Sequence, residues 1–387
     1  MTEDAAVAVA VHRDRVRSWL EDHREELRAM VAAAPDELTG DAEVVRSLAA
    51  AGLSRQGWPV SVGGVGGGVL HRAVLYDELT RASLGVPHWY LSLEVCAPAM
   101  IAFAPHLEDA VRRGIEGTDL WCQGFSEPAA GSDLPALRTR AVRDGALWRL
   151  HGEKIWVSMG HVATHCLLLA RTGEQGARTR GLTMFFVPLA EVAEQQVIPG
   201  LSGRDELGQI VFDGGAVGDD AVVGEVGAGW DVVVYLLQWE RGLYAWQRYC
   251  WLVQQFEAFC VGDPSAAAEH LAPLGEVSAC LIALRNRCLG NLALLHAGQF
   301  IGPEASIEKV LLAKAETTLF DVVREARRLG VMDREDRQAA MQTADYFYSR
   351  MASVYGGSEE IQLDTIGERL LGLPRDPAKA TTSAGRA

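Results

Sequence analysis

Apolar residues in the first third of the chain recur every three or four positions, which is the period of an amphipathic helix. Val16, Leu20 and Leu27 form one such stripe, and Val45 belongs to the next. Residues 1–118 are therefore expected to form an N-terminal helical domain. A glycine-rich stretch at 57–68 interrupts it, but that stretch lacks the Lys-Ser/Thr that ends a nucleotide P-loop, so we interpret it as a connector.

The hydrophobic pattern changes near Leu120 to short runs typical of strands. Residues 141–150 predict two strands around an Asp-Gly turn, and further strand-like runs follow at 166–170, 182–188 and 210–212. These runs indicate a middle β domain over residues 119–229, with the form of a barrel or sandwich.

Helical spacing returns after this region. Residues 231–259 carry a strong apolar stripe, and a second helix is expected over 270–295. A third helix is expected to open at Gly302-Pro303-Glu304 and to close at 327–330, and a fourth precedes Tyr355.

The pattern thus predicts a C-terminal four-helix-bundle domain at 230–376 and a disordered tail at 377–387. The expected fold class is α+β, with helices, then a β domain, then helices.

Composition narrows the functional classes. The 387 residues carry a formal net charge of −15, which argues against a nucleic-acid partner. Seven scattered cysteines without metal-ligand spacing indicate a reducing compartment and no metal site. An acidic N-terminus without a secretion signal, and the lack of a long apolar run, predict a cytoplasmic protein that does not enter a membrane.

Glu240 is the first candidate for chemistry. It lies within the apolar stripe of the helix at 231–259, together with Val233, Leu236 and Leu243. A carboxylate there is either buried or lines a cavity, and burial raises its pKa toward the range of a general base. The alternatives are a buried ion pair with a distant Arg or Lys, and a helix less buried than its pattern indicates.

Three further motifs are candidates for ligand binding. Residues 126–133 form a turn-rich loop with small residues, Trp156 and Ser158 lie on an expected strand, and Gly356-Gly357 precede a helix start. Taken singly, each has a plain structural interpretation: an interdomain connection, a core tryptophan and an ordinary capped turn.

Their order along the chain is more specific. The chain contains Glu-Pro-x-x-Gly-Ser-Asp at 127–133, Gly-x-Lys-x-Trp-x-Ser at 152–158 and Tyr-Gly-Gly-Ser-x-x-Ile-Gln at 355–362. With these motifs it closely resembles the acyl-CoA dehydrogenase family over about residues 20–376. The run at 121–128 and the ending at 367–375 look most like the actinobacterial branch of that family.

The resemblance implies FAD, held between the β domain and the C-terminal helices. It places Phe125 and Ser126 at the flavin ring, and Trp156 and Ser158 beside its N5 edge. The full set of implied cofactor-binding residues is Phe125, Ser126, Gly131, Ser132, Trp156, Ser158, Gly357, Ser358 and Glu360. The implied substrate-contacting residues are Ser132, Gln238, Arg241 and Tyr244.

The implied reaction is α,β-dehydrogenation of an acyl thioester, in which a base removes the α-proton and flavin N5 accepts the β-hydride. Many family members carry that base at the position of Gly356, and a smaller group carries it in a Glu-Arg pair on the first long C-terminal helix. Glu240-Arg241 matches the smaller group. The N–H of Gly356 is then the expected donor to the thioester oxygen, together with a flavin ribityl hydroxyl.

One departure from the family concerns assembly. The Arg-x-x-Phe-Gly segment by which typical members reach a neighbouring subunit's FAD is missing between Arg248 and His270. The expected assembly is therefore a homo- or hetero-oligomer, with acyl-CoA or an acyl carrier protein thioester as substrate and an electron-transfer flavoprotein or another acceptor. The alternatives are a flavin monooxygenase on the same fold and a non-catalytic subunit of a heteromeric dehydrogenase.

Overall fold

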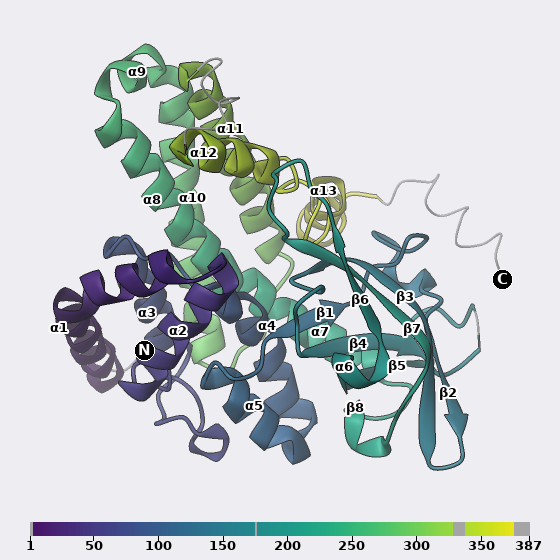
Figure 1. Ribbon diagram of the computed structural model, residues 1–387. Helices are drawn as coiled ribbons and strands as arrows, with labels where there is room; N and C mark the ends of the chain where they lie inside the picture. The colour runs from purple at the N-terminus through teal and green to yellow at the C-terminus, as the bar shows by residue number, and fades with distance from the viewer. Residues whose placement is uncertain (1–2, 175, 328–336, 375–387) are drawn as a thin grey trace. The chain divides into compact units, whose positions relative to one another are not determined.

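Helices form the first part of the chain, as the hydrophobic pattern predicted (Figure 1). The computed structural model describes residues 3–174, 176–327 and 337–374. Asp36 caps the second helix, because its side chain accepts a hydrogen bond from the Thr39 N–H at 2.8 Å. The helices of this region are α1 (Glu3–Ala33), α2 (Glu37–Ala50), α3 (Val69–Arg81), α4 (His88–Phe103) and α5 (Glu108–Ile115).

The strands that follow form one sheet with the order β6-β7-β3-β2-β4-β5-β8, and β1 pairs in parallel with β4 at its side. Trp148, Leu150, Leu168 and Phe185 are among the buried residues of its core. The expected Asp-Gly hairpin is present between β2 and β3. The strands are β1 (Trp121–Gly124), β2 (Arg140–Asp144), β3 (Leu147–Ser158), β4 (His165–Arg171), β5 (Leu182–Pro188), β6 (Glu194–Ile198), β7 (Leu207–Val217) and β8 (Val222–Val223).

The helix expected at 231–259 differs from its prediction. It begins at Gly229 as α7 (Gly229–Trp239), passes through a π-helical turn at Glu240–Tyr244, and continues as α8 (Ala245–Gly262). The π turn places one additional residue in the helix, so the apolar spacing before and after it cannot follow one α-helical register. A pattern read at a constant period does not show such a turn.

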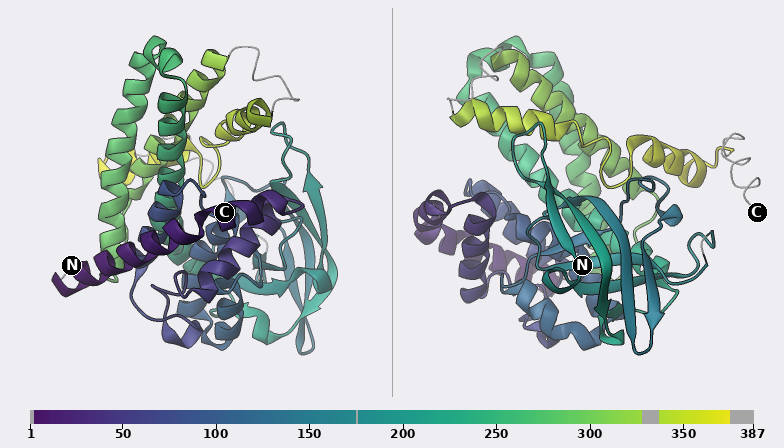
Figure 2. Two further views of the ribbon diagram at one scale, coloured as in Figure 1. Left: turned by 60° about the vertical axis from the view of Figure 1, so that its left-hand side comes forward. Right: turned by 45° about the vertical axis from the view of Figure 1, so that its right-hand side comes forward.

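The chain divides into two compact units, residues 1–255 and 256–387. In the second unit α10 and α11 run side by side in every view (Figure 1, Figure 2). Leu284, Leu319 and Phe320 are buried in it. Its helices are α9 (Pro264–Glu269), α10 (Leu271–His296), α11 (Ala305–Arg327), α12 (Arg337–Ser349) and α13 (Glu359–Thr365), which ends in a second π-helical turn at Ile366–Leu370.

Two expectations fall partly or wholly outside the described residues: the helix end at 327–330 and the tail at 377–387. The domain limits expected at 118/119 and 229/230 remain predictions. The division into compact units lies at a different place, between residues 255 and 256. Within the described ranges, no helix is long and apolar enough to cross a membrane. The order of helices, sheet and helices is the predicted α+β architecture.

Candidate functional site

A buried ion pair joins the Glu-Pro-x-x-Gly-Ser-Asp loop to strand β3. Lys154 Nζ lies 2.8 Å from Glu127 Oε1 and also donates to the Phe125 carbonyl at 3.1 Å. The two oxygens of Glu127 accept the backbone N–H groups of Arg138 and Thr139. Burial alone would raise the pKa of Glu127, but Lys154 and these hydrogen bonds outweigh it and hold that pKa below its ordinary value. Glu127 is therefore ionised at neutral pH, and its contacts with Lys154 and the two N–H groups fix the loop.

The backbone of Phe125 and Ser126 is fixed by the same contacts. The Ile155 N–H donates to the Ser126 carbonyl at 3.0 Å, while Lys154 binds the carbonyl before it. At Gly124, just before them, a Cβ would lie 2.6 Å from Cys166 Sγ, so only glycine allows β1 to approach β4 this closely. The side chains of Phe125 and Ser126 are half-buried.

An irregularity in β3 turns Trp156 outward. The pairing of β3 with β7 shifts register between Lys154 and Val157, and Trp156 has a φ of 60°. The Trp156 side chain is 58% exposed, although Lys154 and Val157 are buried. Bulges re-aim side chains in this way, and strained backbone gathers at functional sites. Trp156 is thus not a core tryptophan, and the nearby Ser158 is exposed as well.

Arg171, the last residue of strand β4, holds two loops. Its guanidinium is buried, and its N–H groups donate to the carbonyls of Pro135 and Leu137 on one loop and of Arg178 and Arg180 on the other. Gly131 and Ser132 lie exposed on the first loop, and Asp133 pairs with Arg178 at 2.7 Å. The loop that carries the predicted ligand-binding residues is therefore tied to the β4–β5 connection.

Glu240 opens the π turn and is half-buried, as are Arg241 and Tyr244, whereas Gln238 is buried. Helix α4 packs against α7 and against the π turn. Burial raises the pKa of Cys96 on α4, and the nearby Cys166 and Glu240 raise it further. Cys96 therefore lies close to the predicted base and to strand β4. A half-buried carboxylate agrees with a position at the edge of a cavity better than with full burial.

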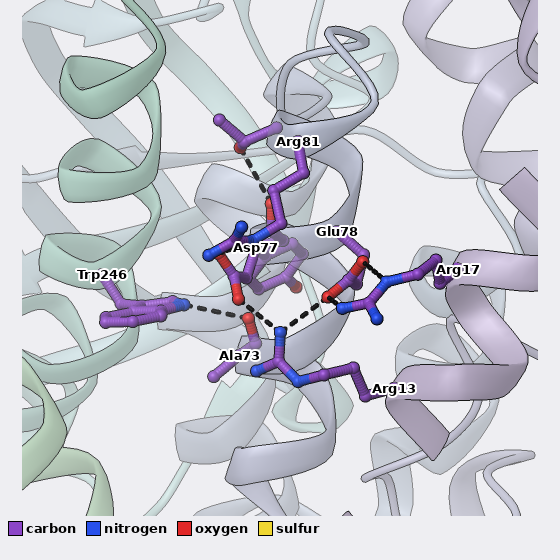
Figure 3. A network of polar contacts seen from close by, with 9 residues as sticks. Arg13, Arg17, Ala73, Asp77, Glu78, Arg81 and Trp246 are labelled. Atoms are coloured by element: carbon purple, nitrogen blue, oxygen red, sulfur yellow. Dashed lines mark hydrogen bonds and ion pairs between the residues drawn. The ribbon is translucent and has the colours of Figure 1, made fainter. Parts of the chain in front are cut away.

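Helix α8 is anchored to α3 directly after the π turn. The Trp246 indole N–H donates to the Ala73 carbonyl at 2.9 Å (Figure 3). One turn further along α3, Glu78 binds Arg17 at 3.0 Å and also pairs with Arg13, which ties α1 to α3. The residues just after the π turn are thus linked to α3, which in turn pairs with charged residues of α1.

The C-terminal motif lies in the second unit. Gly356 and Gly357 have φ values of 63° and 86°, which favour glycine, and Gln362 Nε2 donates to both of their carbonyls at 3.3 Å. Ser358 caps α13. The exposed Glu360 has a lowered pKa because its own backbone N–H and the Ser358 hydroxyl bind the carboxylate. The roles of these residues toward FAD and Glu240 remain predictions.

Sequence reasoning missed three features of the site. Lys154 belongs to the Gly-x-Lys-x-Trp-x-Ser motif, and a charged residue at an inward position of a strand was a usable signal for its ion pair. Arg171 gave no signal, because its partners are backbone carbonyls. The π turn gave none either, because its effect on a hydrophobic pattern is a shift of one residue.

Comparisons with known proteins agree with this architecture. The acyl-CoA dehydrogenase N-terminal domain model matches residues 10–106, and the acyl-CoA dehydrogenase middle domain model matches residues 122–214. The acyl-CoA dehydrogenase IpdE1 of Mycobacterium tuberculosis is 33% identical over 334 residues, covering 85% of this chain and 87% of that protein. The acyl-CoA dehydrogenase FadE34 of the same organism is 31% identical over 90% of this chain and 49% of its own length.

Solved structures show the same fold. The Tcur3481–Tcur3483 steroid ACAD superposes with a TM-score of 0.82 at 22% identity, covering 96% of this chain and 98% of that chain. The ChsE4–ChsE5 complex of M. tuberculosis has a TM-score of 0.76 at 24% identity, covering 97% and 99%. The chain belongs to the acyl-CoA dehydrogenase family. It is accordingly an oxidoreductase of a FAD-dependent family whose relatives act on acyl thioesters.

Proposed function

We propose that this protein is a FAD-dependent dehydrogenase that introduces an α,β double bond into an acyl thioester, with Glu240 as the base. The observation that carries the proposal is the half-buried carboxylate on the π turn, in a chain that has glycine at position 356. A carboxylate partly removed from water and close to the apolar surroundings of Cys96 suits the removal of a weakly acidic α-proton.

The residues of the first unit fit a flat cofactor. The outward Trp156 ring offers an aromatic face, Ser158 and Ser126 offer hydroxyl groups, and the Phe125 backbone is held rigid by Lys154. FAD, when bound, would supply the acceptor for the β-hydride. We propose that Phe125, Ser126, Trp156 and Ser158 hold its ring.

The remaining groups have supporting roles in the proposal. Gly131 and Ser132 lie on an exposed loop suited to a phosphorylated ligand. Gly357, Ser358 and Glu360 are proposed to contact the cofactor as well. The Gly356 N–H polarises the thioester oxygen as enolate character develops. Gln238, Arg241 and Tyr244 flank Glu240 on its helix and are proposed to contact the acyl group.

The test uses purified protein, a panel of acyl-CoA thioesters (straight-chain, 2-methyl-branched and ring-bearing) and an artificial electron acceptor. Wild-type protein should contain FAD and reduce the acceptor with at least one thioester. Glu240→Gln should abolish turnover while the flavin absorbance is retained. Glu359→Gln is the matched control and should keep activity. Activity in Glu240→Gln, or its loss in the control variant, would overturn the assignment of the base.

A second proposal concerns assembly, and the missing Arg-x-x-Phe-Gly segment favours it. We propose that a neighbouring subunit, either identical or of a related sequence, completes the FAD-binding site. An electron-transfer flavoprotein or a similar acceptor is proposed to reoxidise the flavin. Protein expressed alone that is colourless and takes up no added FAD would favour a related partner chain. Full flavin occupancy in the chain expressed alone would show that a related partner chain is not needed to bind FAD.

A further inference from the structure

Helix α3 contacts the residues on both sides of the π turn. The guanidinium carbon of Arg72 lies 3.8 Å from the ring centroid of Trp58 and 5.4 Å from that of Trp239, the residue before Glu240. The next residue on α3 is Ala73, and its carbonyl accepts the indole N–H of Trp246. Two tryptophans that bracket the turn are thus held by two successive residues of one helix.

Arg72 is itself tightly held. Its side chain is 5% exposed, and Nε lies 2.8 Å from Oε2 of Glu94, which is fully buried on α4. Nη1 donates to the Gly57 carbonyl at 2.9 Å. Gly57 has a φ of 96°, and a Cβ there would lie 2.7 Å from Arg72 Cγ. A planar guanidinium near two indole rings, paired with a carboxylate and donating to a carbonyl, has little freedom to move.

The contacts of Arg72 bear on the π turn because they hold Trp239, the residue before it. A π turn is a rare interruption of the α-helical hydrogen-bond pattern, and the direction of the first side chain depends on where the turn begins. Helix α4, which carries Glu94, also packs against the turn. Arg72 therefore connects the glycine-rich connector, α4 and the start of the turn.

We propose that Arg72 is a positioning residue that holds Trp239, fixes the start of the π turn and so aims the Glu240 carboxylate at the substrate α-carbon. This inference rests on the proposed function of Glu240. A displacement of about 1 Å at a reacting group can lower a rate by about a hundredfold. Loss of Arg72 should therefore slow proton removal without removing any group that contacts the substrate.

The experiment compares three variants of the full chain. Arg72→Lys keeps the charge but loses the planar group, and the double variant Arg72→Met/Glu94→Gln removes both buried charges together, which avoids leaving one unpaired. Arg143→Met is the matched control. Arg143 lies over the Trp148 ring at 4.5 Å and pairs with Asp219 at 2.7 Å, but it is exposed on β2.

Each variant is assayed with the acyl-CoA of the panel that the wild type oxidises fastest. Flavin content, Tm, kcat, KM and the kinetic isotope effect of the α-deuterated thioester are measured, with anaerobic exchange of the α-proton into D2O as a readout of the base alone. Both Arg72 variants should lose about ten- to a hundredfold in kcat per bound flavin and in the exchange rate. Their KM should stay near wild type, and their isotope effect should rise. Arg143→Met should match wild type.

Wild-type kcat and exchange rates per bound flavin in both Arg72 variants, whatever their Tm, would overturn the inference and leave Arg72 a structural residue. An equal loss in Arg143→Met would overturn it as well. Failure of the proposed function has a different signature, because the wild type itself would then oxidise no thioester of the panel and exchange no α-proton.

Discussion

His12 shows how one residue can make stability depend on pH. It is buried on α1, with its ring centroid 5.6 Å from that of His71 on α3. Burial, and then the nearby His71 and Arg15, lower its pKa from 6.5 to about 4. The folded protein therefore keeps this imidazole neutral under conditions in which the unfolded chain protonates it.

We predict that the free energy of unfolding falls as the pH is lowered from 6.5 to about 4, because only the unfolded state takes up a proton at His12 in this range. Above pH 6.5 His12 does not change the free energy of unfolding with pH, and below the folded pKa of about 4 the loss is complete. The full loss amounts to roughly 3 kcal/mol. Urea unfolding at a series of pH values would measure it.

His12→Leu should flatten that pH dependence, whereas His151→Leu, at an exposed position on β3, should leave it in place. An unchanged slope in His12→Leu would show that other groups cause the acid sensitivity.

At the scale of elements, the bulge in β3 places backbone strain at Trp156, a residue proposed to contact the cofactor. A residue other than glycine at a φ of 60° costs about 1–2 kcal/mol relative to the ordinary regions. The bulge persists because the Glu127–Lys154 pair and the β3–β7 pairing fix the strand on both sides. The strain is thus the cost of an outward Trp156.

We predict that Trp156→Gly is more stable than Trp156→Ala by about 1 kcal/mol, because glycine accepts this φ and alanine does not. Both variants should bind FAD more weakly, since the aromatic ring is lost. Chemical unfolding and flavin titration would measure the two effects. At Val142, in a regular part of β2, the order of Gly and Ala should be reversed; the same order at both sites would argue against strain at Trp156.

The sequence predicted elements well where hydrophobic period alone decides them. Strands β4 and β5 and helix α10 lie within a few residues of their predicted limits. The hairpin predicted at 141–150 is present, but its second strand, β3, continues to Ser158. The pattern failed at the π turn and at β1, β6 and β8, which are short or have few buried residues. For the site, motif order indicated Trp156 and Ser126, but the contacts that hold them involve buried charges and backbone carbonyls, which no periodicity reports.

For the molecule as a whole, the C-terminal segment leaves apolar side chains exposed. Exposed apolar side chains that gather into a patch mark protein interaction sites. Within the described residues of this segment, the exposed apolar side chains are Val354, Ile361, Leu363, Leu370, Leu371 and Leu373.

We predict that the protein is an oligomer and that Leu371→Asp/Leu373→Asp lowers its mass, because two charges would have to be buried at the subunit contact. Size-exclusion chromatography with light scattering would measure the mass. Val60→Asp, at a 74% exposed position of the first unit, is the control and should change nothing. A monomeric wild type would contradict the prediction.

The contacts of Arg171 with two loops have a consequence for how the sequence of this enzyme can change. Arg171 binds the loops at Pro135 and Leu137 and at Arg178 and Arg180 only through main-chain oxygens, which every amino acid supplies. Point substitutions at exposed positions of these loops leave the contacts with Arg171 in place, whereas an insertion or deletion would displace the carbonyls from the guanidinium. New ligand preferences at the proposed contact Ser132 are therefore accessible to random mutagenesis at constant loop length.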